Sequence, residues 1–130
     1  MKSSAIDAFT RHTASQVNHP IFPERFALGD GLSGAQKLAG AIHRARDDLV
    51  TERDSALQFF GGDLDGIVSR LDDLGELGLT GVYLTPIVRA PSNHKHAATD
   101  FFGIDAMFGG EPALKRLVVA RCRTRATAAA

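Results

Sequence analysis

Two histidines and an aspartate lie close together in one polar stretch of this 130-residue chain. His94, His96 and Asp100 form an H-x-H-x3-D pattern. Imidazole and carboxylate groups at such spacing bind zinc and related metal ions. The sequence fixes no further strong ligand beside them, so two interpretations stay open. One is a metal site, and the other is a polar loop whose histidines form local hydrogen bonds.

Oxygen ligands gather near two other turns. Asp30 follows a glycine, and Gly61 and Asp63 follow a Phe-Phe pair. Calcium takes about six to eight oxygen ligands, and these residues alone do not reach that number. Asp63 directly precedes an apolar periodic segment, so we predict that its carboxylate caps a helix.

Other catalytic patterns find no support. The serines lie in no G-x-S-x-G setting, and Gly61-Gly62 lacks the Lys-Ser/Thr ending of a phosphate loop. The single cysteine, Cys122, rules out an internal disulfide and fits a reducing compartment. From the residues alone we predict no catalytic group.

The histidines need a framework that positions them. The run 80–84 predicts a short strand that stops at Thr85-Pro86, and a polar loop follows up to Gly110. Glu111-Pro112 opens a helix, because proline at the first helical position loses no hydrogen bond. Strand, polar loop and helix are the layout in which α/β proteins place ligands, at the carboxyl ends of parallel strands.

The preceding segments complete this α/β pattern. Apolar residues at helical spacing predict one helix over residues 64–74, with Gly78 suited to a left-handed C-cap. Similar spacing predicts a helix over residues 34–50. Prolines in residues 20–26 restrict any strand there to a short or edge strand.

Composition limits the partners and the compartment. Lys plus Arg and Asp plus Glu both number 15, so the formal charge is zero. This removes the electrostatic case for nucleic acid or an anionic membrane surface. No run approaches the ~20 apolar residues of a membrane span, and residues 1–15 lack the apolar region of a signal peptide. We therefore expect a cytoplasmic protein without nucleic-acid or membrane partners.

Three segments resemble the α-amylase family of glycoside hydrolases, most closely its neopullulanase, cyclomaltodextrinase and maltogenic amylase branch. They are residues 21–30, 59–67 and 84–109, in the family's order. The resemblance implies a (β/α)8 barrel enzyme that hydrolyses or transfers α-1,4-glucosidic bonds with retention. It also implies sugar contacts in the 84–109 segment and a calcium site near residues 30 and 61–63.

The resemblance assigns roles to particular residues. It implies substrate contacts at His94, His96 and Asp100. It implies calcium ligands at Asp30, Gly61 and Asp63. A further ligand of the family's site is lost, because Leu28 stands where the branch often has asparagine. The family usually has tyrosine at the position of His96 and aspartate at that of Ala97.

The chain is too short for a complete barrel, which needs roughly 200 residues or more. We expect α/β structure: a partial (β/α)8 TIM barrel of about two βα units over residues 19–119. A flexible lead-in is expected over residues 1–18, and a disordered or helical Arg/Ala-rich tail over residues 120–130. Retaining glycosidases need two carboxyl groups about 5 Å apart, which the family takes from later strands, so we expect the chain alone to be inactive.

An α-glucan or maltooligosaccharide is the expected partner, together with a missing C-terminal half of the barrel. The alternative interpretation is a non-catalytic module that binds maltooligosaccharide or complements a separate polypeptide.

Overall fold

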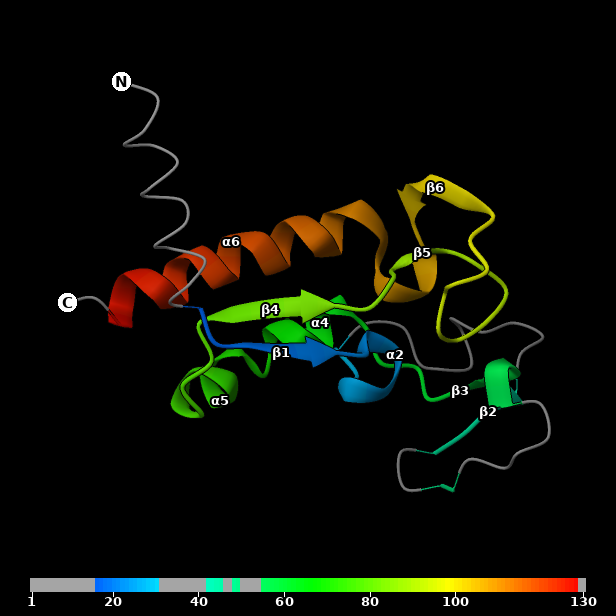
Figure 1. Cartoon of the computed structure of the whole chain (residues 1–130), viewed down its shortest axis with the longest axis horizontal. Helices are drawn as coiled ribbons and strands as arrows, with labels where there is room; N and C mark the ends of the chain where they lie inside the picture. The colour runs from blue at the N-terminus through cyan, green and yellow to red at the C-terminus, as the bar shows by residue number, and fades with distance from the viewer. Residues whose placement is uncertain (1–15, 31–41, 46–47, 50–54, 129–130) are drawn as a thin grey trace.

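A computed structural model describes residues 16–30, 42–45, 48–49 and 55–128. Strands β1 (Asn18–Ile21) and β4 (Gly81–Leu84) pair in parallel in the middle of the molecule, as Figure 1 shows. Ile21 lies opposite Leu84 in the register. The predicted strand at 80–84 and the parallel topology are confirmed, and β1 is short, as the flanking prolines led us to expect.

Several helices lie next to this pair of strands (Figure 1). α2 (Pro23–Phe26) follows β1, and α4 (Leu64–Val68) and α5 (Leu71–Glu76) precede β4. The long helix α6 (Gly110–Ala128) runs alongside β4 and packs on α4 and α5 (Figure 1). One buried apolar cluster joins these elements: Ile21, Phe59, Leu64, Ile67, Leu71, Leu74, Met107, Phe108, Ala113 and Leu117.

The predicted helix over residues 64–74 is two helices, because the chain turns between α4 and α5. The Ser69 hydroxyl donates to the Gly66 carbonyl at 2.8 Å, and Arg70 N donates to Ile67 O at 3.0 Å. Such short-range hydrogen bonds compete with the regular helical pattern. The apolar face is as predicted, since its leucines and isoleucine are all buried.

Both predicted helix ends are confirmed. Asp63 is the N-cap of α4, and its Oδ1 accepts a hydrogen bond from Gly66 N at 2.7 Å. Gly78 has a φ of 81° just after α5, where Leu79 N donates to Leu74 O at 3.1 Å. A residue with a side chain adopts this left-handed conformation only with strain, so glycine closes the helix.

The predicted helix over residues 34–50 is wrong where the structure describes it. Residues 31–41, 46–47 and 50 lie outside the described residues. Ile42–His43 forms strand β2, which pairs in parallel with β3 (Gln58–Phe59). Arg44 N extends this pairing to Phe59 O at 2.7 Å. Pairing with a distant segment outweighs the local helical spacing here.

The stretch between β4 and α6 is more ordered than the single long loop we expected. It contains the antiparallel strands β5 (Val88–Arg89) and β6 (Asp100–Ile104), followed by a 3-10 turn, η2 (Ala106–Phe108). Another 3-10 turn, η1 (Ser55–Leu57), precedes β3. Residues 85–109 form the β4–α6 loop.

The ends of the chain partly meet the expectations. Residues 1–15 of the lead-in lie outside the described residues, and β1 begins within it at Asn18. The Arg/Ala-rich tail is helical, since α6 continues without interruption to Ala128. Alanine and arginine both have high helix propensity. Within the described part of the chain, no helix has the length and apolar character needed to span a membrane.

Candidate functional site

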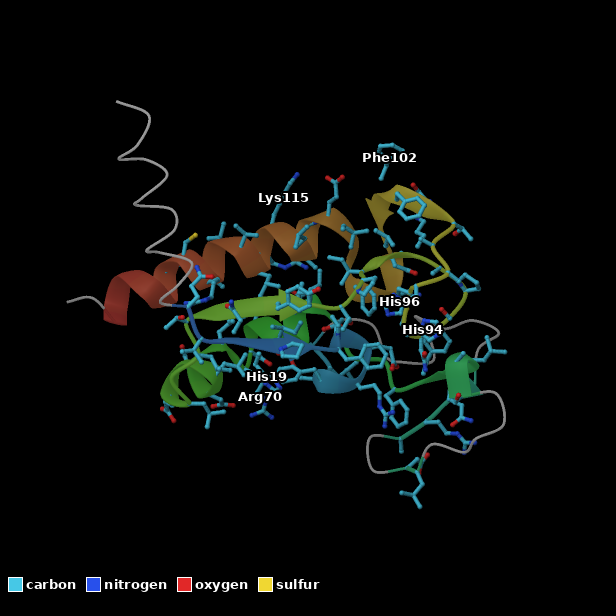
Figure 2. The ribbon with its side chains drawn as sticks, viewed as in Figure 1. His19, Arg70, His94, His96, Phe102 and Lys115 are labelled. Carbon is cyan, nitrogen blue, oxygen red and sulfur yellow. The ribbon has the colours of Figure 1, made fainter. Side chains whose placement is uncertain are left out.

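The β4–α6 loop lies where the parallel strands end. Because β1 and β4 run in the same direction, their carboxyl ends meet at one edge. Figure 2 places His94 and His96 beyond this edge. Ligands of α/β proteins gather at such an edge.

The loop brings His94 and His96 together. Their ring centroids are 5.4 Å apart, with 33° between the ring planes. His94 Nδ1 lies 3.3 Å from the hydroxyl of Ser92 and accepts a hydrogen bond from His96 N at 3.3 Å. A backbone N–H can only donate, so this contact requires an unprotonated Nδ1 on His94. The neutral imidazole then carries its proton on Nε2.

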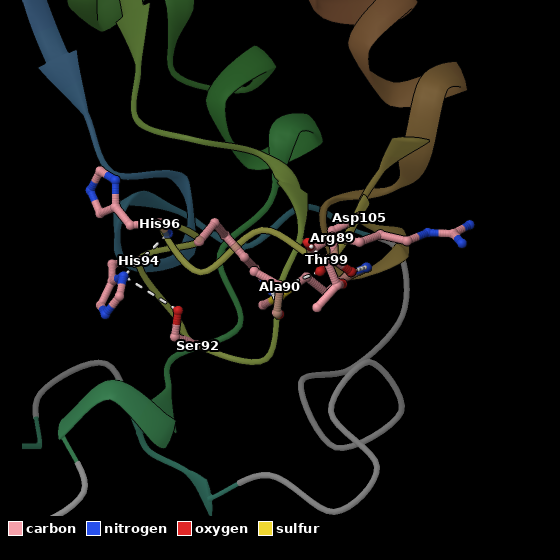
Figure 3. A network of polar contacts seen from close by, with 9 residues as sticks. Arg89, Ala90, Ser92, His94, His96, Thr99 and Asp105 are labelled. Atoms are coloured by element: carbon pink, nitrogen blue, oxygen red, sulfur yellow. Dashed lines mark hydrogen bonds and ion pairs between the residues drawn. The ribbon is translucent and has the colours of Figure 1, made fainter. Parts of the chain in front are cut away.

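Asp100 belongs to a different part of the loop. Its Oδ1 accepts a hydrogen bond from Phe102 N at 2.9 Å, and its Oδ2 lies 3.8 Å from the guanidinium of Arg89. Figure 3 shows the two histidines on one side of the loop and Arg89 on the other. Among the described residues no three His, Cys, Asp or Glu side chains gather as metal ligands. The zinc interpretation gains no support, and a sugar contact by Asp100 stays a prediction.

Two buried polar side chains hold the loop, and the sequence did not predict either. Asn93 Nδ2 donates to Ser55 O at 2.7 Å and to Gln58 O at 2.9 Å. The ammonium of Lys95, which is 2% exposed, lies 2.7 Å from the carboxylate of Asp105. Lysine is ordinarily exposed, so no local pattern predicts its burial here.

Glu24 is another buried polar group near this edge. Its side chain is fully buried, and its Oε1 accepts hydrogen bonds from Phe60 N and, at 3.0 Å, from Gly61 N. Burial raises the pKa of Glu24 above the ordinary value of 4.5, although these hydrogen bonds and the charges of Arg25 and Lys95 act in the opposite direction. No local sequence pattern indicates this role.

The predicted calcium ligands lie on neighbouring turns. Asp63 is buried, and its Oδ1 accepts hydrogen bonds from Gly29 N at 2.9 Å and from Gly66 N. Asp30 is exposed and directly follows Gly29, so both carboxylates belong to adjacent segments. Carboxylate and carbonyl oxygens suit calcium in kind. The residues named in advance supply fewer ligands than calcium normally takes.

Known proteins match this chain over most of its length. The model of the alpha amylase catalytic domain matches residues 20–126. A cyclomaltodextrinase of Geobacillus thermopakistaniensis is 47% identical over 109 residues, and an intracellular maltogenic amylase of Bacillus subtilis is 46% identical over 112 residues. These matches cover 84% and 85% of the chain but only 17% of each relative.

Solved structures show the same similarity. The cyclic α-maltosyl-(1→6)-maltose hydrolase of Arthrobacter globiformis superposes with a TM-score of 0.71 at 38% identity, over 86% of this chain and 23% of that one. The type III pullulan hydrolase of Thermococcus kodakarensis has a TM-score of 0.77 at 29% identity, over 85% and 22%. The chain therefore belongs to the alpha-amylase family and corresponds to part of its catalytic domain.

Proposed function

We propose that this chain forms one wall of an α-glucan-binding cleft, as part of a (β/α)8 barrel of the cyclomaltodextrinase, maltogenic amylase and neopullulanase branch. The observation that carries the proposal is the pairing of His94 and His96 at the carboxyl edge of β1 and β4. The names of the relatives support an α-glucan as the ligand, since they include a cyclomaltodextrinase and a maltogenic amylase.

The two imidazoles suit a carbohydrate chemically. His96 is exposed, and the planar ring can pack against the apolar face of a glucose unit. His94 holds its Nδ1 against His96 N, so its Nε2–H is the group left to donate to a sugar hydroxyl.

Direct binding can be measured by titrating the full chain with maltoheptaose and following the histidine ring signals by NMR. Unchanged signals at millimolar sugar would refute the proposed site.

The carboxyl groups around this loop are engaged in structural contacts. Asp105 pairs with Lys95, Asp100 accepts from Phe102 N, and Glu24 accepts from backbone N–H groups. A retaining glycosidase needs two carboxyl groups about 5 Å apart that flank the scissile bond.

We therefore propose that the chain alone does not hydrolyse α-glucans. Pure protein is expected to release no reducing sugar from starch, pullulan or cyclodextrins. Activity that copurifies with the chain and changes with its mutations would contradict this.

A calcium ion bound by Asp30, the Gly61 carbonyl and Asp63 is a further part of this proposal. Calcium binding to the folded state raises the melting temperature, and Asp30→Ala is expected to remove the increase. Asp72→Ala changes another exposed aspartate, on α5, and should leave the calcium-dependent increase intact. A calcium-dependent increase that survives Asp30→Ala would argue against these ligands.

The structure also favours a second function, complementation of a separate polypeptide. An apolar groove of about 380 Å³ lies between β4 and α6, and its lining includes Val82, Leu84, Leu114 and Val118. Within the described residues β4 pairs only with β1, and none of them forms a strand along its other edge. Coexpression with the rest of a cyclomaltodextrinase catalytic domain tests this, because restored hydrolysis would favour complementation.

A further inference from the structure

One lysine of the β4–α6 loop has its charge inside the protein. Lys95 Nζ donates to Ala90 O at 2.9 Å and lies 2.7 Å from Asp105 Oδ2. The ring centroids of Phe59 and Phe108 are 5.5 and 5.6 Å from the same nitrogen, within the range of cation–π attraction. The ammonium thus exchanges its water shell for two acceptors and two aromatic rings.

The carboxylate that pairs with Lys95 is itself fixed. Asp105 Oδ1 accepts a hydrogen bond from Met107 N at 3.1 Å, and Asp105 N donates to Ile87 O at 2.9 Å. Lys95 therefore ties the tip of the loop to its first part through Ala90 and to its last part through Asp105. Figure 3 shows both of these residues away from the histidine pair.

The backbone conformation of Lys95 is also unusual. Its φ of 59° is the single left-handed value among the described non-glycine residues. A residue with a side chain keeps this conformation only where its surroundings impose it. The buried contacts of the side chain supply that constraint. The chain bend at Lys95 leaves His94 and His96 as neighbours on the other side of the loop.

We propose that Lys95 is the positioning residue of the α-glucan site: its buried ammonium holds the loop so that His94 and His96 face the sugar together. The inference rests on the proposed α-glucan binding by the two histidines. Lys95 does not touch the sugar. It acts through the bend that brings His96 N to His94 Nδ1, and so it also fixes the tautomer of His94.

The test replaces Lys95 by methionine, which retains most of the apolar length and removes the charge. Two quantities are measured on the full chain: the affinity for maltoheptaose, and the ¹⁵N signals of the histidine rings without sugar. Lys95→Met is expected to weaken binding about tenfold, the loss of one oriented hydrogen bond. It is also expected to remove the signal of an unprotonated, hydrogen-bonded Nδ1 on His94.

The matched control is Lys115→Met. Lys115 lies on α6 with a side chain that is 78% exposed, where it pairs with Glu111 at 3.7 Å. Figure 2 shows it projecting from α6, well apart from His94 and His96. This variant removes the same charge and should change neither the affinity nor the histidine signals. A folded Lys95→Met chain with native affinity and native histidine signals would overturn the proposal.

The histidine signals separate this inference from the proposed function. If the unchanged chain binds no maltoheptaose, sugar binding is refuted, while a change of the His94 signal in Lys95→Met still supports positioning by Lys95. If Lys95→Met does not fold, Asp105→Asn weakens the same ion pair and keeps the lysine. The ¹⁵N signals of the unchanged chain are a further test. A His94 Nδ1 that is protonated in neutral solution would overturn the proposal.

Discussion

His96 stands where the related branch usually has tyrosine. Both side chains are flat, but tyrosine offers a larger apolar face for packing against a sugar. His96→Tyr is therefore expected to tighten maltoheptaose binding about fivefold, a gain of roughly 1 kcal/mol. Isothermal titration calorimetry measures it. His19→Tyr is the control, because His19 is exposed on β1 and the variant adds the same ring elsewhere. It should leave maltoheptaose binding unchanged. Equal effects from both variants would count against stacking at position 96.

The burial of Glu24 leads us to expect a pH dependence of the chain's stability. Burial raises the folded-state pKa of Glu24 above 4.5. The contribution of Glu24 to folding stability is therefore fully present below pH 4.5 and is lost as the pH rises through the folded-state pKa. The Glu24→Gln side chain stays neutral, so the variant does not lose this contribution at higher pH. In melting curves recorded from about pH 4 to about pH 7, the melting temperature of the variant relative to that of the unchanged chain should therefore increase as the pH rises through the folded-state pKa of Glu24.

The control for this prediction is Glu76→Gln. Glu76 is an exposed glutamate at the end of α5, where solvent keeps its carboxylate hydrated. Its replacement should leave the pH profile of the melting temperature parallel to that of the unchanged chain. A Glu24→Gln profile that is also parallel would mean that burial does not dominate the ionisation of Glu24.

Single residues were predictable where their role depends on neighbours in sequence. Asp63 could be predicted as a cap because a capping residue and its helix are adjacent. Lys95 and Glu24 could not, because each is buried by segments far away in the chain. Lys95 contacts Phe59 across 36 positions, and Glu24 accepts from Gly61 across 37. No local period records such contacts.

At the scale of elements, α4 packs so closely on the turn after α2 that it requires a glycine. A Cβ built on Gly66 would overlap the carbonyl of Ala27. Gly66→Ala is therefore expected to destabilise the fold by about 3 kcal/mol, since the overlap is with backbone that cannot rotate away. Urea unfolding followed by circular dichroism measures this loss.

Gly75 in α5 is the matched position. A Cβ there would meet nothing within 4 Å, and alanine favours the helix over glycine by about 0.5–1 kcal/mol. Gly75→Ala should therefore stabilise the chain by that amount. Similar losses for Gly66→Ala and Gly75→Ala would show that α4 does not pack on the turn as closely as the structure has it.

Elements were predicted well where the apolar pattern and the terminating residues agree. β4 and the start of α6 have clear limits in sequence, and both are present. The pattern over residues 64–74 could give the buried face but not the turn at Ser69, because a hydroxyl hydrogen bond leaves the spacing of the leucines unchanged. The strands β5 and β6 were missed because their pairing joins residues on both sides of the histidines.

At the scale of the whole molecule, β4 and α6 leave an apolar groove open. Val118 lines it and is 55% exposed, and Tyr83 on β4 is 64% exposed. Exposed apolar surface beside the free edge of a strand favours association. We therefore expect the isolated chain to self-associate at micromolar concentration, as sedimentation velocity would show. The same surface would contact the partner in the complementation proposed above.

Two neighbouring valines on α6 allow a sharp test of this association. Val118 lines the groove, whereas Val119 is 57% exposed and lies outside the groove lining. Val118→Lys places a charge against the surface that must be buried, so it should shift the sedimentation profile towards monomer, because desolvating an unpaired charge is costly. Val119→Lys adds the same charge at equal exposure and should leave the profile unchanged. If both lysines disperse the chain equally, net charge rather than the groove controls association, and the open β4 edge is not the surface through which this chain meets a partner.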